Sequence, residues 1–361
     1  MERVVWHIVE GLSKKAIVFV IGPKGCKEHL PTNVSCAEIP SYPLPLFLWL
    51  AKISALYHAS RFRPKIVFAG SGLTAPLTWL AARMCRARSA VYLHGLDIDT
   101  DHPLYNILWK PFIRRSNVVI VNSRFTKRLA INAGVPEKHI FILHPGVSLP
   151  DDSKADQLRK RFRNRYKLDD KPLMLYIGRI TARKGLAFFV NRILPQIVKS
   201  ISDVLLVVIG EEPSRSVMKQ TGEMLKIEKS LKTHELQNHV IFLGARPMND
   251  SDISAAYFAA DVHVFPVQYR PHDNEGFGMV ALEAAAHGTP TVAYATGGVV
   301  DAVSDGISGK LVAPGDADDF AAAILDLLHD PLDERQIRQF AERFAWPNFG
   351  QALIRAILEK P

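Results

Sequence analysis

The chain has 361 residues, of which 48% are hydrophobic, and this is enough apolar material for two cores and so for two domains. Its three cysteines, Cys26, Cys36 and Cys85, include no C-x2-C pair, which argues against a disulfide framework or a zinc site. No apolar run approaches the ~20 residues that span a bilayer. The first residues do not resemble a signal peptide, so we expect a cytoplasmic protein.

Charge is divided unevenly along the chain. Residues 1–150 hold 19 Lys and Arg against 8 Asp and Glu, a net charge of +11, whereas residues 151–361 hold 26 against 28, a net charge of −2. A basic first half predicts an anionic partner, namely a membrane surface, an anionic glycolipid or a nucleic acid. Solvated surface charge without a partner is the alternative.

Short apolar runs alternate with helical patterns over the first 150 residues. The runs predict strands at 4–8, 16–21, 66–69, 90–93, 118–122 and 140–143, with helices near 45–61, 74–87, 103–115 and 124–133. Such alternation is typical of an α/β domain with a parallel sheet. Ser123 is a good N-cap for the last of these helices.

The helix predicted near 45–61 is unusually apolar. An apolar stripe contains Leu46, Phe47, Leu50, Ile53, Leu56 and Tyr57. Trp49 is placed off this stripe, and basic residues follow the helix. The pattern fits a core helix whose basic end complements its dipole. It fits equally a lip that rests on a membrane while the basic residues meet anionic headgroups.

The strand predicted at 90–93 ends in His94, which is followed by Asp97, Asp99 and Asp101. A histidine at a strand end is most often structural. The acidic residues are interpreted as loop carboxylates, and no required metal is expected.

A highly charged stretch, 150–171, predicts a surface helix that connects the two domains. A second α/β series follows. Its strands are predicted at 173–177, 204–209, 240–243, 262–265, 291–294 and 310–312, with helices after Ala317 and after Trp346.

The sequence GRITARKG follows the first strand of this second series. Arg179 and Lys184 would then lie at the end of a central strand, where an anionic ligand would bind. Arg183, next to Lys184, is interpreted as a surface residue.

The stretch DNEGFGMVALEAAAHGTPTVA, residues 273–293, places a glycine loop before a helix. Unpaired N–H groups and the helix dipole attract an anion such as phosphate at such a helix start. Glu275 in the loop and Glu283 in the helix lie on either side of that anion site, where their carboxylates could hold hydroxyl groups. This is the chemistry that a nucleotide-sugar requires.

This stretch, followed by GGVVDAV and DGISGKLV, resembles the C-terminal signature of the family-4 retaining glycosyltransferases, including its E-x7-E element. The resemblance implies the α/β GT-B fold, two Rossmann-like domains whose parallel sheets face each other across a cleft. Residues 1–150 would bind the acceptor and residues 151–345 the nucleotide-sugar. Residues 346–361 would form a helix that crosses back to the first domain.

The resemblance also implies roles for single residues. The catalytic set would be His94, facing the donor sugar, Arg179 and Lys184, clamping the diphosphate, and Glu275, contacting the sugar. The donor-binding set would be Gly178, Gly210, Leu243, Gly276, Phe277, Gly278, Met279 and Glu283.

The implied reaction needs no cofactor and no metal. The donor would be a UDP-, GDP- or ADP-sugar, and the acceptor a hydroxyl on a lipid-linked or cell-envelope glycan. The protein would be peripheral on the inner face of the membrane, and nucleic acid is not an expected partner.

Two departures from the family pattern stand out. Glu212 occupies a position where the family has a glycine, which puts a close backbone approach to the nucleotide in doubt. The strands predicted at 4–8 and 16–21 leave no room for the family's glycine-rich loop and long helix, so its acceptor residues are not carried over. The rival functions are another nucleotide-sugar enzyme, such as an epimerase or a phosphorylase, and a noncatalytic sugar-nucleotide or nucleic-acid binding protein.

Overall fold

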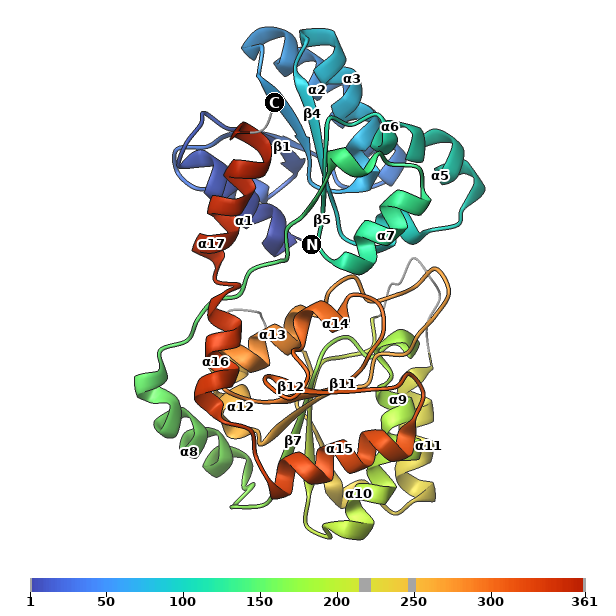
Figure 1. Cartoon of the computed structure of the whole chain (residues 1–361), viewed down its shortest axis with the longest axis vertical. Helices are drawn as coiled ribbons and strands as arrows, with labels where there is room; N and C mark the ends of the chain where they lie inside the picture. Colours follow the sequence, from blue (N-terminus) through green and yellow to red (C-terminus); the bar gives the residue numbers. More distant parts are fainter. Residues whose placement is uncertain (1, 214–221, 246–250, 360–361) are drawn as a thin grey trace. The chain divides into compact units, whose positions relative to one another are not determined.

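The computed structural model describes residues 2–213, 222–245 and 251–359. The chain forms two compact units (Figure 1). Unit 1 consists of Met1–Gly146 and Trp346–Pro361, and unit 2 of Val147–Ala345. In the part of the chain that is described, no helix is both long enough and apolar enough to cross a bilayer.

Unit 1 contains a four-stranded parallel sheet in the order β3-β4-β5-β6. Helices α3 to α7 lie between successive strands, as expected for parallel neighbours that need a crossover. A separate parallel pair, β1-β2, precedes helix α2 in the chain. The bounds are β1 Phe19–Pro23, β2 Ser35–Ile39, α2 Leu44–Phe62, β3 Ile66–Ala69, α3 Ala75–Cys85, β4 Arg88–Leu93, α4 Leu96–Asp99, α5 Pro103–Leu108, α6 Lys110–Arg114, β5 Val118–Val121, α7 Arg124–Asn132 and β6 Ile140–Ile142.

The prediction of a strand at 4–8 is wrong, because these residues lie inside helix α1, Glu2–Ser13. Val4, Ile8 and Gly11 are buried, and their spacing of four and three residues is that of a helix face. This face packs on α17, Trp346–Ile354, where a Cβ on Gly11 would lie 3.2 Å from Cα of Gly350. A run of five apolar residues cannot by itself separate a strand from a buried helix turn. The strand β2 was not predicted.

Helix α2 presents two different faces. Ala51, Ala55 and Ala59 are buried, and the last two pack with α3 through Ala81. A row of large apolar residues is exposed, with 41% of Leu46, 59% of Trp49, 45% of Ile53 and 59% of Tyr57 accessible. The prediction that Trp49 lies off the apolar stripe is therefore wrong, since Trp49 belongs to this exposed row.

Unit 2 is built on six parallel strands in the order β12-β11-β10-β7-β8-β9. The chain enters at β7 in the middle, moves to one edge through β8 and β9, and returns to β10 on the other side of β7. The change of direction between β7 and β10 is the switch point at which doubly wound sheets bind ligands. The strand bounds are β7 Leu173–Ile177, β8 Leu205–Ile209, β9 Val240–Phe242, β10 Val262–Phe265, β11 Thr291–Tyr294 and β12 Gly309–Val312.

Alternate residues of the β7 strand enter separate cores on the two faces of this sheet. Met174 and Tyr176 join the core formed with α10 and α15, whereas Leu173 and Leu175 join the core formed with α8 and α12. Figure 1 shows these two helix layers on opposite sides of the strands. The helix bounds are α8 Ala155–Tyr166, α9 Leu186–Phe188, α10 Leu194–Ser200, α11 Glu223–Thr233, α12 Ser251–Ala259, α13 Met279–Ala286, α14 Val299–Ala302, α15 Ala317–His329 and α16 Glu334–Glu342.

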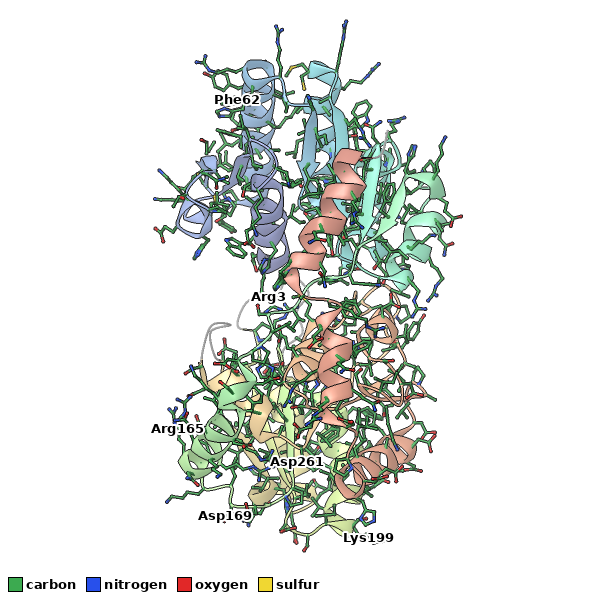
Figure 2. The ribbon with its side chains drawn as sticks, turned by 60° about the vertical axis from the view of Figure 1, so that its left-hand side comes forward. Arg3, Phe62, Arg165, Asp169, Lys199 and Asp261 are labelled. Carbon is green, nitrogen blue, oxygen red and sulfur yellow. The ribbon has the colours of Figure 1, made fainter. Side chains whose placement is uncertain are left out.

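Helix α8 is the helix predicted in the charged connection, and it is anchored to the sheet by Asp261. Arg163, which is buried, contacts one Asp261 oxygen at 3.0 Å, and Arg159 contacts the other at 2.7 Å. The same carboxylate accepts a hydrogen bond from the Leu173 amide at 2.7 Å. Figure 2 places Asp261 within unit 2, while Lys199 lies at one end of it.

Candidate functional site

The carboxyl ends of β7 and β8 meet with no side chain between them. The Gly178 amide donates to the Ile209 carbonyl at 3.0 Å, and a Cβ on Gly210 would lie 1.9 Å from the Gly178 carbonyl oxygen. Gly178 has φ of +153° and Gly210 of +151°, which favours glycine at both positions. Gly178 and Gly210, both predicted to bind the donor, therefore pack closely at the carboxyl ends of β7 and β8.

The turn after β7 brings four charged side chains together. Lys184 Nζ donates to Glu275 Oε2 at 2.8 Å, and Arg183 donates to the same oxygen. Arg183 Nε also contacts Asp273 Oδ1 at 3.1 Å. Lys184 and Glu275, predicted from separate motifs, thus form an ion pair across 91 residues of sequence.

Arg183 corrects the sequence-based interpretation. The prediction that Arg183 is a surface residue is wrong, because only 7% of it is exposed and its guanidinium contacts both Asp273 and Glu275. Sequence reasoning missed Asp273 as well. The available signal was a second cation beside Lys184 matched by a second acid two residues before Glu275.

Arg179, by contrast, is exposed at the surface of the same turn. Its backbone carbonyl accepts a hydrogen bond from the Tyr176 hydroxyl at 3.0 Å. Its positive charge is near enough to contribute to lowering the pKa of Lys184.

Burial and ion pairing act in opposite directions on this cluster. Burial raises the pKa of Glu275, but the charges of Lys184 and Arg183 outweigh it and hold that pKa below its usual value. Burial lowers the pKa of Lys184, and Glu275 offsets only part of this effect. The carboxylate is therefore held ionised, while burial of the lysine is only partly offset by its ion pair.

The glycine loop that follows Glu275 is locked to the loop after β11. The Gly298 amide donates to the Glu275 carbonyl at 2.8 Å, and a Cβ on Gly298 would lie 1.9 Å from the Gly276 carbonyl oxygen. Phe277 is buried, which holds the loop down between its two glycines. The backbone next to Glu275 is thus fixed by neighbours from two parts of the chain.

Helix α13 begins at Met279, after Gly278 in the left-handed conformation with φ of +100°. The N-cap residue offers no side-chain acceptor to the first turn, so this helix start suits an external anion. Glu283 lies in the middle of the helix and accepts a hydrogen bond from the Tyr257 hydroxyl at 3.1 Å.

A hollow of about 1060 Å³ opens beside this cluster within unit 2. Residues of α9, α11 and the loop from Gln268 to Asp273 line it. Asp273 thus belongs both to the wall of the hollow and to the charged cluster.

Glu212, the residue that replaces a family glycine, caps a helix. Its carboxylate accepts a hydrogen bond from the Glu223 amide at 2.9 Å, at the start of α11. Leu243, a predicted donor-binding residue, continues the β9 ladder through its amide, which donates to the Val208 carbonyl at 2.9 Å.

His94 in unit 1 is held by a backbone carbonyl and by the carboxylate of Asp97. Its Nε2 donates to the Gly70 carbonyl at 2.8 Å, and its amide donates to Asp97 Oδ1 at 2.8 Å. Burial lowers the pKa of His94, and Asp97 partly opposes this shift. The ring is therefore neutral near pH 7, with Nδ1 as its acceptor nitrogen.

The carboxylate of Asp97 also accepts from the Gly72 and Gly95 amides, at 2.9 and 3.1 Å. The interpretation of Asp97 as a loop carboxylate is wrong, because Asp97 lies in the short helix α4. Over the described ranges, no group of three or more His, Cys, Asp or Glu could hold a metal ion. The N-cap prediction for Ser123 is confirmed, because its hydroxyl accepts from the Thr126 amide at 3.0 Å.

Comparison with solved structures identifies the class of fold. A crystal structure of Anabaena Alr3699/HepE in complex with UDP matches with a TM-score of 0.81 at 17% identity, covering 99% of this chain and 96% of that chain. WaaG, a glycosyltransferase involved in lipopolysaccharide biosynthesis, matches with a TM-score of 0.68 at 16% identity, covering 99% and 96%. The predicted GT-B fold with two Rossmann-like, parallel-sheet domains is confirmed.

The sequence identifies the family. Residues 159–344 match the model of the glycosyl transferases group 1, and residues 1–150 match that of glycosyltransferase family 4. The chain therefore belongs to the group 1, family 4 glycosyltransferases, as its motifs implied.

Two curated relatives lie in this family. GDP-mannose-dependent alpha-(1-6)-phosphatidylinositol monomannoside mannosyltransferase of Mycolicibacterium smegmatis is 31% identical over 72% of this chain and 66% of its own length. D-inositol 3-phosphate glycosyltransferase of Mycobacterium marinum is 29% identical over 77% of this chain and 57% of its own length. The chain thus spans less than two thirds of each of these relatives.

Proposed function

We propose that this chain is a retaining, metal-independent hexosyltransferase that moves a sugar from a UDP-, GDP- or ADP-sugar to an acceptor hydroxyl. The observation that carries the proposal is the buried pairing of Lys184 with Glu275 at the switch point of unit 2, beside the start of α13. A cation, a carboxylate and a helix N-terminus at one place match a diphosphate joined to a polyol.

The proposed chemistry breaks the bond between the anomeric carbon and the diphosphate oxygen. Arg179, Lys184 and the N–H groups from Gly276 to Met279 stabilise the negative charge that develops on the leaving diphosphate. Each well-placed donor of this kind is worth roughly 3 kcal/mol. The acceptor hydroxyl attacks from the same face, and its proton passes to a leaving phosphate oxygen.

The other predicted residues position the donor. Glu275 accepts hydrogen bonds from the sugar hydroxyls and Glu283 from the ribose, because ionised carboxylates are strong acceptors. His94 accepts a hydrogen bond from a sugar hydroxyl at Nδ1, since its Nε2 already donates to the Gly70 carbonyl. Gly178, Gly210 and Leu243 form the backbone floor beneath the nucleotide.

The acceptor is proposed to be a hydroxyl on a lipid-linked or cell-envelope glycan. The relatives named above act on a phosphatidylinositol mannoside and on an inositol phosphate, and WaaG acts in lipopolysaccharide synthesis. The names of the two curated relatives share a polyhydroxylated inositol that carries a phosphate.

A panel of UDP-glucose, UDP-galactose, GDP-mannose and ADP-glucose tests the donor, because a bound nucleotide-sugar raises the melting temperature by mass action. Transfer from the labelled donor, with the anomeric configuration of the product read by NMR, then tests the reaction. Glu275→Ala and Lys184→Ala should each abolish transfer and keep cooperative melting. The exposed residues Glu228 and Lys199 supply the matched controls Glu228→Ala and Lys199→Ala. Full transfer by either site variant would refute the proposal.

We propose further that unit 1 binds an anionic membrane surface, through the exposed row Leu46, Trp49, Ile53 and Tyr57 of α2. Between Glu38 and Asp97 the sequence has no acidic residue and seven Lys or Arg. Apolar side chains beside an excess of positive charge are the features of an interfacial helix. Each basic residue near an anionic surface adds about 1 kcal/mol.

Flotation with vesicles tests this partner. The chain should float with phosphatidylglycerol vesicles more than with phosphatidylcholine vesicles, and less at high salt. The double variant Trp49→Ala, Ile53→Ser should lose most of this binding. Leu225→Ala, an exposed leucine of unit 2, is the control. Equal flotation of the double variant and the control would rule out this surface.

A further inference from the structure

Arg183 and Asp273 are the two members of the charged cluster to which the proposed reaction assigns no role. Arg183 lies in the turn Ala182–Lys184, and its carbonyl accepts a hydrogen bond from the Gln268 amide at 2.8 Å. A Cβ on Gly185 would lie 1.9 Å from the Pro266 carbonyl oxygen. The turn is therefore pinned to the segment after β10, and the guanidinium has little freedom to move with its backbone.

The cluster contains two cations and two carboxylates, and between 9% and 14% of each side chain is exposed. Both cations reach the same oxygen of Glu275, Oε2, from adjacent residues. A buried carboxylate that lost both cations would be strongly disfavoured in its ionised form. Either Arg183 or Lys184 can therefore move away from Glu275 without leaving the carboxylate unpaired, provided that the other cation stays in contact with it.

The two cations differ in what holds them. Lys184 carries a flexible ammonium group that forms an ion pair with Glu275. Its Nζ also lies over the Phe265 ring, 5.0 Å from the ring centroid. Arg183 is a planar fork held at two points, with Nε on Asp273 and Nη1 on Glu275. Of the two, Lys184 is the one that can turn to an arriving phosphate.

We propose that Arg183, held by Asp273, is a positioning residue that keeps Glu275 ionised and oriented when Lys184 leaves it for the donor diphosphate. Oε2 stays on the arginine, and Oε1 is presented to the sugar hydroxyl. The proposal rests on the proposed donor site, and it adds an exchange of partners within the cluster. Arg183 itself touches neither sugar nor phosphate.

Several groups near Glu275 or its lysine partner are charged or can titrate. Arg183 and Lys184 face it from the turn after β7, and Asp273 comes from its own loop. Tyr176 of β7 lies within its electrostatic reach, with a pKa raised by burial and by Glu275. His263 of β10 lies near Lys184, and burial lowers its pKa to about 3. Removing Arg183 thus moves the acid-side titration of Glu275 upward.

The variants Arg183→Met and Asp273→Asn test the proposal, with Arg192→Met, an exposed arginine of unit 2, as the matched control. Binding of UDP and GDP alone, measured by calorimetry, should change less than ~3-fold in Arg183→Met, because Lys184 remains for the phosphates. Turnover with the active donor should fall ~100-fold, in the range for loss of a preorganised site group. The acid limb of the kcat profile should move to higher pH. Asp273→Asn should lower turnover and move the acid limb to higher pH as well, each by a smaller amount.

Three outcomes would overturn the proposal. An unmoved acid limb would show that Arg183 does not govern Glu275. An equal loss of affinity for nucleoside diphosphate and for nucleotide-sugar would show that Arg183 binds phosphate itself. If Arg183→Met does not melt cooperatively, Asp273→Asn decides, and a wild-type profile in that variant refutes the role of the pair. A wild-type chain that binds none of the nucleotides or nucleotide-sugars would instead refute the donor site itself, and the proposal with it.

Discussion

The polar side chains near the strand ends have different kinds of hydrogen-bonding partner in the two units. In unit 1, Asp97 accepts from three backbone amides, and His94 donates to a backbone carbonyl. In unit 2, Arg183, Lys184 and Glu275 satisfy one another through their side chains. Both arrangements lie at the carboxyl ends of parallel strands, where α/β sheets bind ligands.

The difference bears on what each site can do. A backbone amide cannot leave its loop, so the carboxylate of Asp97 fixes the shape of the loop after β4. A side-chain cation can rotate to a new anion, so the unit 2 cluster can exchange partners with a charged ligand. We therefore expect substitution of Asp97 in unit 1 to act on stability, and substitutions in the unit 2 cluster to act on binding and turnover.

The largest effect should come from the backbone that supports the unit 2 cluster. Gly298→Ala would place a Cβ 1.9 Å from the Gly276 carbonyl oxygen, which only a shift of the loop can relieve. We expect a loss of about 3 kcal/mol in the free energy of unfolding, at the upper end for overpacking, measured by urea titration. In Gly315→Ala the added Cβ meets open space, and left-handed backbone strain alone should cost about 1 kcal/mol. Equal losses would show that the two glycine loops are not locked together.

Asp97→Ala should have the next largest effect. It removes the acceptor of three backbone amides, each worth about 1 kcal/mol, so stability should fall by roughly 2 to 3 kcal/mol. The increase in melting temperature caused by UDP or GDP should remain, because those contacts are assigned to unit 2. Loss of that ligand-induced increase in a folded variant would break the distinction between the units.

A third effect appears only as the pH falls. Burial lowers the pKa of His263 to about 3, with Lys184 adding to the shift, whereas Asp97 opposes the lowering at His94. A histidine whose pKa is lower in the folded than in the unfolded state costs stability as pH falls below about 6.5, and costs nothing above it. The slope is about 1.4 kcal/mol per pH unit for each such group.

Melting temperatures between pH 7.5 and 4.5 measure this slope. His263→Leu should flatten it more than His94→Leu, since no acid offsets the burial of His263. The exposed His102→Leu serves as control. If His94→Leu flattened the slope as much as His263→Leu, the electrostatic contrast between the units would be incorrect.

Much of the fold followed from local pattern. The strands of unit 2 and the helix after the glycine loop were predicted because short continuous apolar runs, glycines and helix starts are set by residues close in sequence. The prediction of a strand at 4–8 was wrong because local pattern is limited in length. Five residues carry too little periodicity to distinguish a strand from a turn of helix α1. The face of α2 that Trp49 occupies could not be predicted either, because it depends on where α3 packs.

The family, the two parallel-sheet domains and the motifs that carry Lys184 and Glu275 could all be predicted from the order of the residues. The burial of Arg183, and its contacts with both Asp273 and Glu275, depend on how the chain packs in three dimensions. Local residues set the backbone of each turn, but the partner that receives a side chain comes from a segment some 90 residues away. The parallel sheet brings that segment back to the same edge, and no local pattern encodes which charges then meet.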